Sequence, residues 1–301
     1  MHSCLVWGSG LIFHKNIPLL KYFEQSGKII VSGITSKDSL FETIAGYKYI
    51  PKLELCENNR LSQYDKIIVM ADGNAYKEIC SEIIDLGFPD KNIVPYKVMG
   101  LVGFDFEKYE KLRENTPTII APNCWGGITY NTLGLSFKSS IINMFIEPDD
   151  YMKMIGNLEY YMDQELEYVR SQYNSDIDIT YPVLRCGDIL LHFNHYNSVE
   201  EAIAKWEQRK KRINWNNLFI MFFDEFGKKV EDFSRINNKK KIYFYKELSP
   251  EDKSDWMLKL PCPLNDNAFY NIVNRCGKGE IVYYDVFELL LNGKIVLHST
   301  I

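Results

Sequence analysis

The sequence lacks several features that would assign it to a specialised class of protein. No stretch approaches the roughly 20 consecutive apolar residues that would cross a bilayer. The N-terminal segment MHSCLVWGSG has neither the basic stretch nor the long apolar run of a secretory signal. No Cys-x-x-Cys pair occurs among the seven cysteines, which suits reduced thiols better than a disulfide framework or a zinc site. These absences predict a cytoplasmic protein without a transmembrane segment or a structural metal.

An excess of positive charge is also missing. The chain has 35 Lys and Arg against 40 Asp and Glu, a formal net charge of -5, which argues against a protein that works mainly by neutralising a nucleic-acid backbone. The charged fraction of 25% and the hydrophobic fraction of 46% are those of globular proteins. With 301 residues, the chain is long enough for two domains that each bury a core.

The N-terminal part of the chain alternates segments that predict strands with segments that predict helices. Short apolar runs that favour strands lie at 4–7, 28–34, 65–71 and 92–95. Helix-length segments lie at 19–25 and 76–86, and Pro18 predicts that the first of these helices begins late. This order is typical of βαβ units around a buried parallel sheet. The sequence therefore predicts a Rossmann-like domain over residues 1–116.

The pair Thr116-Pro117 ends a polar, helix-like segment and marks the predicted domain boundary. Strands are then expected at 118–121, 141–146, 184–193, 218–223, 242–245 and 281–284. Helices are expected at 128–135, at 148–170 with a break near Gly156, and at 199–212, and the segment 237–241 reads as an exposed turn. The predicted fold class is α/β, with a second Rossmann-like domain over residues 117–301 and a mainly parallel sheet in each domain.

The segment Gly8-Ser9-Gly10 follows the first predicted strand. Glycines in that place let backbone amides approach a diphosphate, and a helix N-terminus adds positive partial charge. A dinucleotide fingerprint would continue with glycine where the chain has Phe13, and with an acid where it has Ile34-Thr35-Ser36, so both departures argue against NAD. We expect either a nucleotide or nucleotide-sugar site at Gly8, Ser9 and Gly10, or a tight turn that the fold requires.

A second glycine loop, Asn123-Cys124-Trp125-Gly126-Gly127, lies between a predicted strand and a predicted helix. The amide of Asn123 can bond a hydroxyl or phosphate, Trp125 can stack on a base or sugar, and the glycines allow close approach of the backbone. All five residues are therefore candidate ligand-binding positions. The alternative is that Trp125 fills the core while Gly126 and Gly127 shape the turn.

Two histidines, His192 and His195, lie at the end of the strand predicted at 184–193. Because polar groups at the carboxyl end of a parallel strand commonly form sites, either histidine is a candidate general base on a sugar hydroxyl, with Asp188 to orient the imidazole. A purely structural role for both is the alternative. The His-x-x-His spacing lacks a convincing third ligand, so no metal site is predicted.

Cations gather at the end of the helix predicted at 199–212. Arg209 or Arg212 is a candidate clamp for a diphosphate, because the planar guanidinium matches phosphate oxygens. The alternative is a solvated cluster that the helix dipole stabilises. A separate alternative pairs Cys124 with His192 or His195 as nucleophile and base for acyl transfer, although nothing in the sequence brings these residues together.

Several runs in the second part resemble a bacterial family of unknown function, the one numbered nineteen-nineteen among such domains. They are IAPNCWGG at 120–127, YPV at 181–183, HFNHY at 192–196, AIAKW at 202–206 continuing to Arg209, and RIN at 212–214. The resemblance covers about residues 117 to 223. Members of that family are often described as exopolysaccharide-biosynthesis proteins. The resemblance therefore implies a polysaccharide context, and it supplies no catalytic residues.

The N-terminal runs LVWGSG at 5–10 and YDKIIVMA at 64–71 are similar to the small Rossmann-like domains that precede sugar-modifying transferases. This resemblance implies a domain that either holds a nucleotide-linked sugar or acts as a degenerate scaffold, so it indicates a ligand class and no reaction.

Two hypotheses for the function follow. In the first, the protein is a transferase of surface or exopolysaccharide biosynthesis that transfers or modifies a sugar. Its donor is a nucleotide-linked sugar or another phosphorylated small molecule bound between the domains. In the second, it is a non-catalytic nucleotide-sugar-binding or assembly module of the same pathway. The sequence identifies no cofactor, predicts no nucleic-acid partner, and is compatible with a homo-oligomer. It leaves the reaction open.

Overall fold

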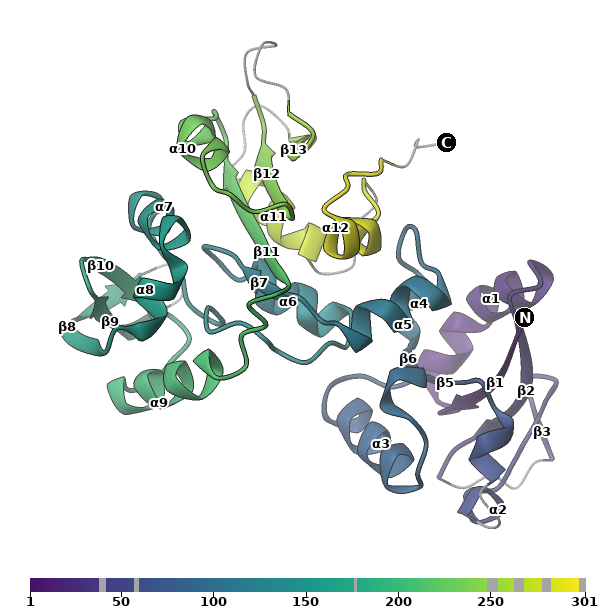
Figure 1. Cartoon of the computed structure of the whole chain (residues 1–301). Helices are drawn as coiled ribbons and strands as arrows, with labels where there is room; N and C mark the ends of the chain where they lie inside the picture. Colours follow the sequence, from purple (N-terminus) through teal and green to yellow (C-terminus); the bar gives the residue numbers. More distant parts are fainter. Residues whose placement is uncertain are drawn as a thin grey trace. The chain divides into compact units, whose positions relative to one another are not determined.

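The computed structural model describes residues 1–37, 42–56, 60–175, 178–247, 254–262, 268–277 and 283–297, and Figure 1 shows its helices and strands. The chain divides into two compact units, Met1–Gly100 and Leu101–Ile301. Each unit contains a parallel sheet, so the predicted α/β class is confirmed, while the assignment of both units as Rossmann-like stays a prediction. No helix among these residues is long and apolar enough to cross a bilayer.

The first unit is built on a four-stranded parallel sheet in the order β2-β1-β5-β6. Its elements are β1 (His2–Trp7), α1 (Leu11–Gln25), β2 (Ile29–Thr35), the hairpin strands β3 (Thr43–Ile44) and β4 (Tyr47–Lys48), α2 (Lys52–Cys56), β5 (Lys66–Val69), α3 (Gly73–Asp85), β6 (Ile93–Pro95) and α4 (Tyr96–Met99). Ile83 of α3 packs on the sheet face that carries Leu5, Trp7, Ile67 and Val69. The four strands predicted for this part of the chain are confirmed.

Helix α1 begins at Leu11, directly after Gly10, so the prediction that it begins late at Pro18 was wrong. Pro18 lies inside the helix, where it removes one backbone hydrogen bond. The helix still forms because Phe13, Leu20 and Phe23 are buried on one side of it.

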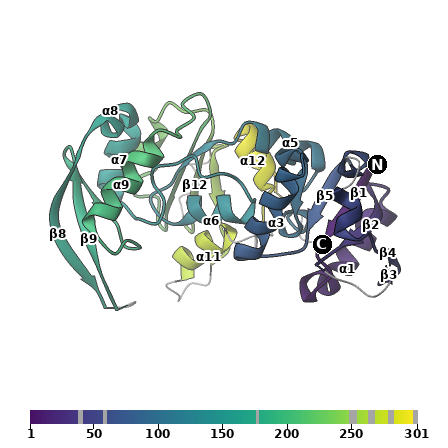
Figure 2. The ribbon, with the colours of Figure 1, turned by 90° about the horizontal axis from the view of Figure 1, so that it is seen from below.

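The second unit combines a parallel sheet, in the order β13-β12-β11-β7, with an antiparallel sheet, in the order β10-β9-β8. Its elements are α5 (Phe106–Glu114), β7 (Thr118–Ile120), α6 (Trp125–Thr132), α7 (Pro148–Gly156), α8 (Leu158–Asp163), β8 (Leu166–Asn174), β9 (Ile179–Cys186), β10 (Ile189–His192), α9 (Val199–Lys210), β11 (Leu218–Asp224), α10 (Val230–Ser234), β12 (Lys241–Tyr245), β13 (Met257–Lys259), α11 (Ala268–Gly277) and α12 (Val286–Asn292). Figure 2 shows the long ribbon of β8 and β9, and α11 beside α6.

The antiparallel sheet corrects the interpretation of residues 141–193 in three places. The helix expected to reach Arg170 ends at Asp163 and is followed by β8, although the predicted break near Gly156 is confirmed. The single strand expected at 184–193 is instead the hairpin of β9 and β10, which turns at Gly187 with a φ of 61°. The strand expected at 141–146 reduces to one bridge between Phe145 and His192.

Three further predictions for the second unit concern the cap of α9, the turn at 237–241 and the strand at 281–284. The capping box of α9 is confirmed, since the Ser198 hydroxyl accepts a hydrogen bond from the Glu201 amide at 3.1 Å. The turn expected at 237–241 is not wholly exposed. Lys241 is buried in β12, where its ammonium donates to three carbonyl oxygens, those of Phe233, Ser234 and Ile236. Half of the strand expected at 281–284, residues 281 and 282, lies outside the described residues, and Tyr284 forms an isolated bridge with Leu297.

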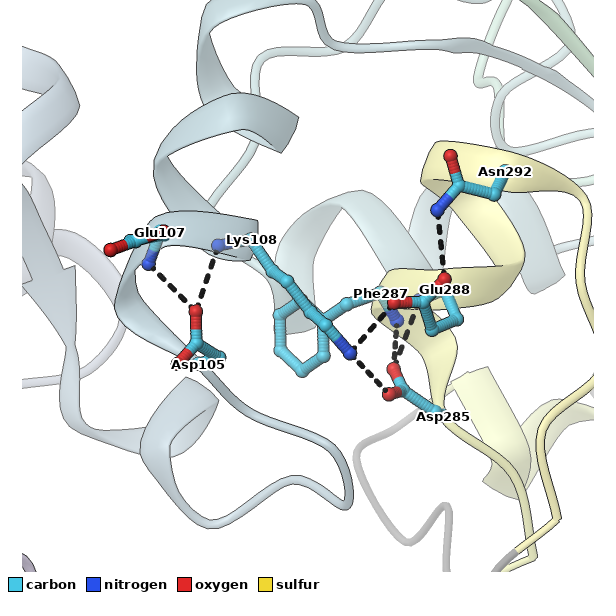
Figure 3. Close-up of polar contacts among 7 residues, drawn as sticks. All are labelled: Asp105, Glu107, Lys108, Asp285, Phe287, Glu288 and Asn292. Atoms are coloured by element: carbon cyan, nitrogen blue, oxygen red, sulfur yellow. Dashed lines mark hydrogen bonds and ion pairs between the residues drawn. The ribbon is translucent and has the colours of Figure 1, made fainter.

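The division between the units falls before α5, whereas the sequence placed it after that helix, at Thr116-Pro117. Helix α5 packs on α12 and so belongs to the second unit. Figure 3 shows the contact: Lys108 of α5 bonds Asp285 at 3.1 Å and Glu288 at 2.8 Å. This contact raises the pKa of Lys108 and lowers that of Glu288. Sequence patterns could not show it, because the partners lie 177 positions apart.

Asp285 is expected to matter more than an ordinary helix cap. It is 3% exposed, and it accepts hydrogen bonds from the amides of Phe287 and Glu288 as well as from Lys108. We expect Asp285→Ala to lower the free energy of unfolding by about 2–3 kcal/mol, because it removes a cap and leaves a half-buried ammonium without one of its partners. Urea denaturation of the full chain measures the change.

The matched control is Asp105→Ala. Asp105 caps α5 through the amides of Glu107 and Lys108 (Figure 3), and among the described residues it forms no ion pair. Its loss should cost only about 1 kcal/mol. Equal costs for the two variants would show that the pairing with Lys108 adds nothing to the cap.

Candidate functional site

A cavity of about 570 Å³ lies at the carboxyl end of β7 and β11, the end at which parallel sheets commonly hold ligands. Strand β7 leads into the loop Pro122-Asn123-Cys124, and β11 contributes Phe222 and Phe223, just before its last residue, Asp224. Other elements add the remaining walls. The lining comprises Pro122, Asn123, Cys124, Phe145, Ile146, Glu147, Pro148, Asn174, Asn194, His195, Phe222, Phe223 and Tyr270.

The cavity brings Cys124 and His195 together. The Sγ atom of Cys124 lies 3.7 Å from Nε2 of His195, although the two residues are 71 positions apart. Cys124 directly precedes α6, at its N-cap position, and His195 follows β10 on the way to α9. Among the described residues, nothing bonds to the other ring nitrogen of His195. The contact is thus a thiol–imidazole pair without a third orienting group in that part of the chain.

Asn123 shapes the loop that carries the thiol. Its Oδ1 accepts a hydrogen bond from the Trp125 amide at 3.0 Å, and its Nδ2 donates to Oδ1 of Asn274 on α11 at 3.4 Å. A Cβ on Gly126 would lie 3.2 Å from a methyl group of Ile119 on β7, so glycine lets α6 start close to the sheet. Gly127 is less constrained, since its nearest neighbour, Ile142, would be at 3.6 Å.

Trp125 points into the core instead of the cavity. It is fully buried, and its ring stacks on Phe219 of β11 at 6.0 Å between centroids and lies 6.1 Å from Phe244 of β12. Of the two interpretations of this residue, the geometry favours the structural one. The sequence could not distinguish them, because a tryptophan in a glycine loop suits either role.

His192 and His195 have different surroundings. His192 is 5% exposed, stacks on Phe145 with centroids 4.4 Å apart, and does not line the cavity. Burial lowers the pKa of its imidazole to about 4, so the ring is neutral at working pH. His195 is exposed and faces the cysteine. The structure thus separates two candidates that the sequence left equal.

Asp188 lies at the hairpin turn before β10, and its carboxylate bonds Lys153 at 3.0 Å and the Tyr161 hydroxyl at 2.7 Å. Both contacts lower its pKa. These partners replace the histidine that the sequence assigned to it, because the hairpin puts Asp188 and His192 at opposite ends of β10.

The two candidate phosphate-binding arginines do not line the cavity either. The guanidinium of Arg209 donates to the Ile142 carbonyl at 3.0 Å and to the Tyr196 hydroxyl, which holds the loop before α7 in place. Arg212 is exposed beyond the end of α9.

The loop Gly8-Ser9-Gly10 belongs to the first unit and is separate from this cavity. Gly8 has a φ of 113°, and its amide donates to the Thr35 carbonyl at 2.8 Å. The loop lies where the strand order reverses direction, between β2 on one side of β1 and β5 on the other, which is the usual ligand position in open α/β sheets. Binding there stays a prediction.

The cavity also contains residues that the sequence analysis missed. Glu147 directly precedes α7, Asn194 directly precedes His195, and Tyr270 comes from α11. Only the first two had a local signal, since each adjoins a segment already singled out. In the part of the chain that the structure describes, no cluster of three or more His, Cys, Asp or Glu residues is arranged to hold a metal ion.

Comparison with known protein families shows to which family the part of the chain that contains this cavity belongs. The family described as Domain of unknown function (DUF1919) matches residues 95–290, which is more than half of the chain. The chain belongs to the DUF1919 family. The match extends beyond the 117–223 expected from the sequence and includes all the residues that line the cavity, from Pro122 to Tyr270.

A protein similar to this chain is found in Haemophilus influenzae. It is 32% identical over 181 residues, which cover 59% of this chain and 84% of the relative, and it is described only as an uncharacterised protein. The bacterial family that the motifs indicated is therefore confirmed. Of the two candidate sites, the glycine loop of the first unit lies outside the DUF1919 match, and the cavity lies inside it.

Proposed function

We propose that the protein is a cysteine-dependent enzyme that transfers or hydrolyses an acyl group, with Cys124 as nucleophile and His195 as base. The observation that carries this proposal is the 3.7 Å contact between the two side chains within a cavity large enough for a small-molecule substrate. The sequence named this pairing as an alternative and left His192 as an equal partner. The burial of His192 supports His195.

The chemistry follows from the pair. His195 accepts the thiol proton, and Sγ attacks the carbonyl carbon of the substrate, which forms a tetrahedral oxyanion. The imidazolium then gives the proton to the leaving group as the bond to it breaks, and the acyl group stays on sulfur. A water or acceptor molecule then loses its proton to His195 and attacks the carbonyl carbon of the thioester. The imidazolium returns this proton to Sγ as the carbon–sulfur bond breaks, which releases the thiol.

Helix α6 supports both negative charges. Cys124 occupies its N-cap position, where the helix dipole favours a thiolate. The amides of Gly126 and Gly127 lie in the first turn of α6, and amides in the first turn of an α-helix have no acceptor within the helix. We assign these amides as donors to the oxyanion, on the ground that they follow Cys124 directly; neither glycine is among the described lining residues.

The lining argues against a phosphate-linked substrate in this cavity. No lysine or arginine is among its residues in the described part of the chain. Arg209 instead donates to the Ile142 carbonyl, and Arg212 is exposed beyond the end of α9. A nucleotide-linked sugar would therefore bring its diphosphate into a cavity whose described lining offers no lysine or arginine to bind it. A sugar-modifying role in polysaccharide biosynthesis is compatible with the proposal only if the transferred group is an acyl group.

Alkylation of the thiol tests the proposal without knowledge of the substrate. We expect iodoacetamide at neutral pH to modify Cys124 at least about tenfold faster than the exposed Cys56, because a neighbouring base increases the thiolate fraction. His195→Ala should remove most of this difference, while His192→Ala should not. Peptide mass spectrometry over time gives the rate at each cysteine. Equal rates at Cys124 and Cys56 would favour a non-catalytic binding module instead.

A further inference from the structure

The charge of the cavity comes from one carboxylate. Among the described residues that line it, Glu147 is the only acid, and none is a lysine or an arginine. Glu147 is exposed and occupies the N-cap position of α7, yet its side chain makes no capping hydrogen bond. The cavity therefore has a negative group at its wall that the helix does not use.

The neighbouring acids are occupied, and Glu147 is not. Asp149 pairs with Lys229, and Asp150 accepts a hydrogen bond from the Leu190 amide at 2.9 Å. Among the described residues, the Glu147 carboxylate has no hydrogen-bond or ion-pair partner. A second acceptor of the lining, Oδ1 of Asn194, is buried and likewise has no partner in that part of the chain. Buried acceptors in proteins are nearly always satisfied, so Oδ1 of Asn194 points to a ligand that donates hydrogen bonds, and the exposed Glu147 carboxylate is free to accept from the same ligand.

Aromatic rings form much of the remaining wall. Phe223 of β11 and Tyr270 of α11 have centroids 5.9 Å apart, and Phe145 packs 6.1 Å from Tyr181. Burial raises the pKa of Tyr181, and the negative charge of Glu147 raises it further. Arg170 opposes this effect, but it is exposed on β8 and does not line the cavity. Ring faces attract cations, and a carboxylate beside them adds a counter-ion.

We infer that the substrate presents an ammonium group to Glu147. Among the described lining residues, a carboxylate without a partner, an unsatisfied amide oxygen, aromatic rings and the lack of lysine or arginine together suit a positively charged hydrogen-bond donor. The inference rests on the proposed function, since it assigns Glu147 as the specificity residue of the same cavity. It names the substrate class as acyl donors or acceptors that carry an amine and excludes those that carry phosphate at this position.

Charged thiol reagents test the inference without the natural substrate. Cys124 is modified in the full chain with methanethiosulfonates that carry trimethylammonium, sulfonate or a neutral methyl group. Each rate is divided by the rate of the same reagent with free 2-mercaptoethanol. We expect the cationic reagent to react at least about tenfold faster than the anionic one, because a nearby unit charge acts with opposite sign on the two.

Glu147→Gln should reduce this rate ratio at least about fivefold, since it removes the charge and keeps the shape. The matched control is Asp149→Asn, two positions away and outside the lining, which should change the ratio less than about twofold. A ratio that Glu147→Gln leaves unchanged overturns this inference alone, provided that the neutral reagent still modifies Cys124 faster than Cys56. A Cys124 no faster than Cys56 with the neutral reagent overturns the proposed function and this inference together.

Discussion

Replacement of Cys124 by alanine is expected to abolish acyl transfer. Without Sγ, no covalent intermediate forms, and the rate should fall at least about a thousandfold. The measurement is the burst of p-nitrophenol from p-nitrophenyl acetate, together with detection of the acetylated Cys124 peptide by mass spectrometry. Cys56→Ala, which removes an exposed thiol in the first unit, should leave both signals unchanged.

Replacement of His195, the base of the pair, gives a second and independent test in the same experiment. His195→Gln should lower the rate by about 10²–10⁴, the usual contribution of a positioned general base. His192→Gln is the matched control, because its ring lies in the core and its pKa of about 4 keeps it neutral over the working pH range. A loss of the burst on His192→Gln, with a folded protein and an unaffected His195→Gln, would contradict the assignment of the base.

Trp125→Ala is expected to cause the largest loss of stability among single substitutions near the cavity. The side chain is fully buried between α6 and the parallel sheet, in contact with Phe219 and Phe244. Its removal should cost about 3–5 kcal/mol, through lost transfer free energy and the void left behind. Hydrogen exchange read peptide by peptide is the suitable measurement, since two compact units can unfold separately.

The control is Trp215→Ala in the same unit. Trp215 is 41% exposed, so its removal should cost less than about 1 kcal/mol. If the two variants were equally stable and Trp125→Ala altered only the labelling of Cys124, Trp125 would be a wall of the site instead of part of the core.

Much of the fold was predictable because short apolar runs have few alternatives. The strands of the first unit and the strands β7, β11 and β12 of the second follow from such runs, and the cap of α9 follows from Ser198 and Glu201. The errors come from segments where two structures compete. Residues 184–193 are apolar enough for one long strand, and only the turn at Gly187 divides them into a hairpin. A Gly-Asp pair between apolar runs was the available signal.

The sequence indicated residues that belong to the site, but it did not show which of them come together. The sequence singled out Asn123, Cys124 and His195, all of which line the cavity. It also singled out His192, Arg209 and Trp125, which are structural in their contacts. The same residue types serve binding and packing, and the difference lies in neighbours that come from other parts of the chain.

By itself, the sequence determined the α/β class, the DUF1919 family and the loop that carries Cys124, because each depends on residues that are close together along the chain. Only the tertiary structure decided which histidine meets the thiol, which acid faces the cavity, and that α5 belongs with α12. Each of these depends on contacts between side chains tens to hundreds of positions apart, and such contacts arise when buried surfaces of whole elements pack together. Local patterns do not encode that packing.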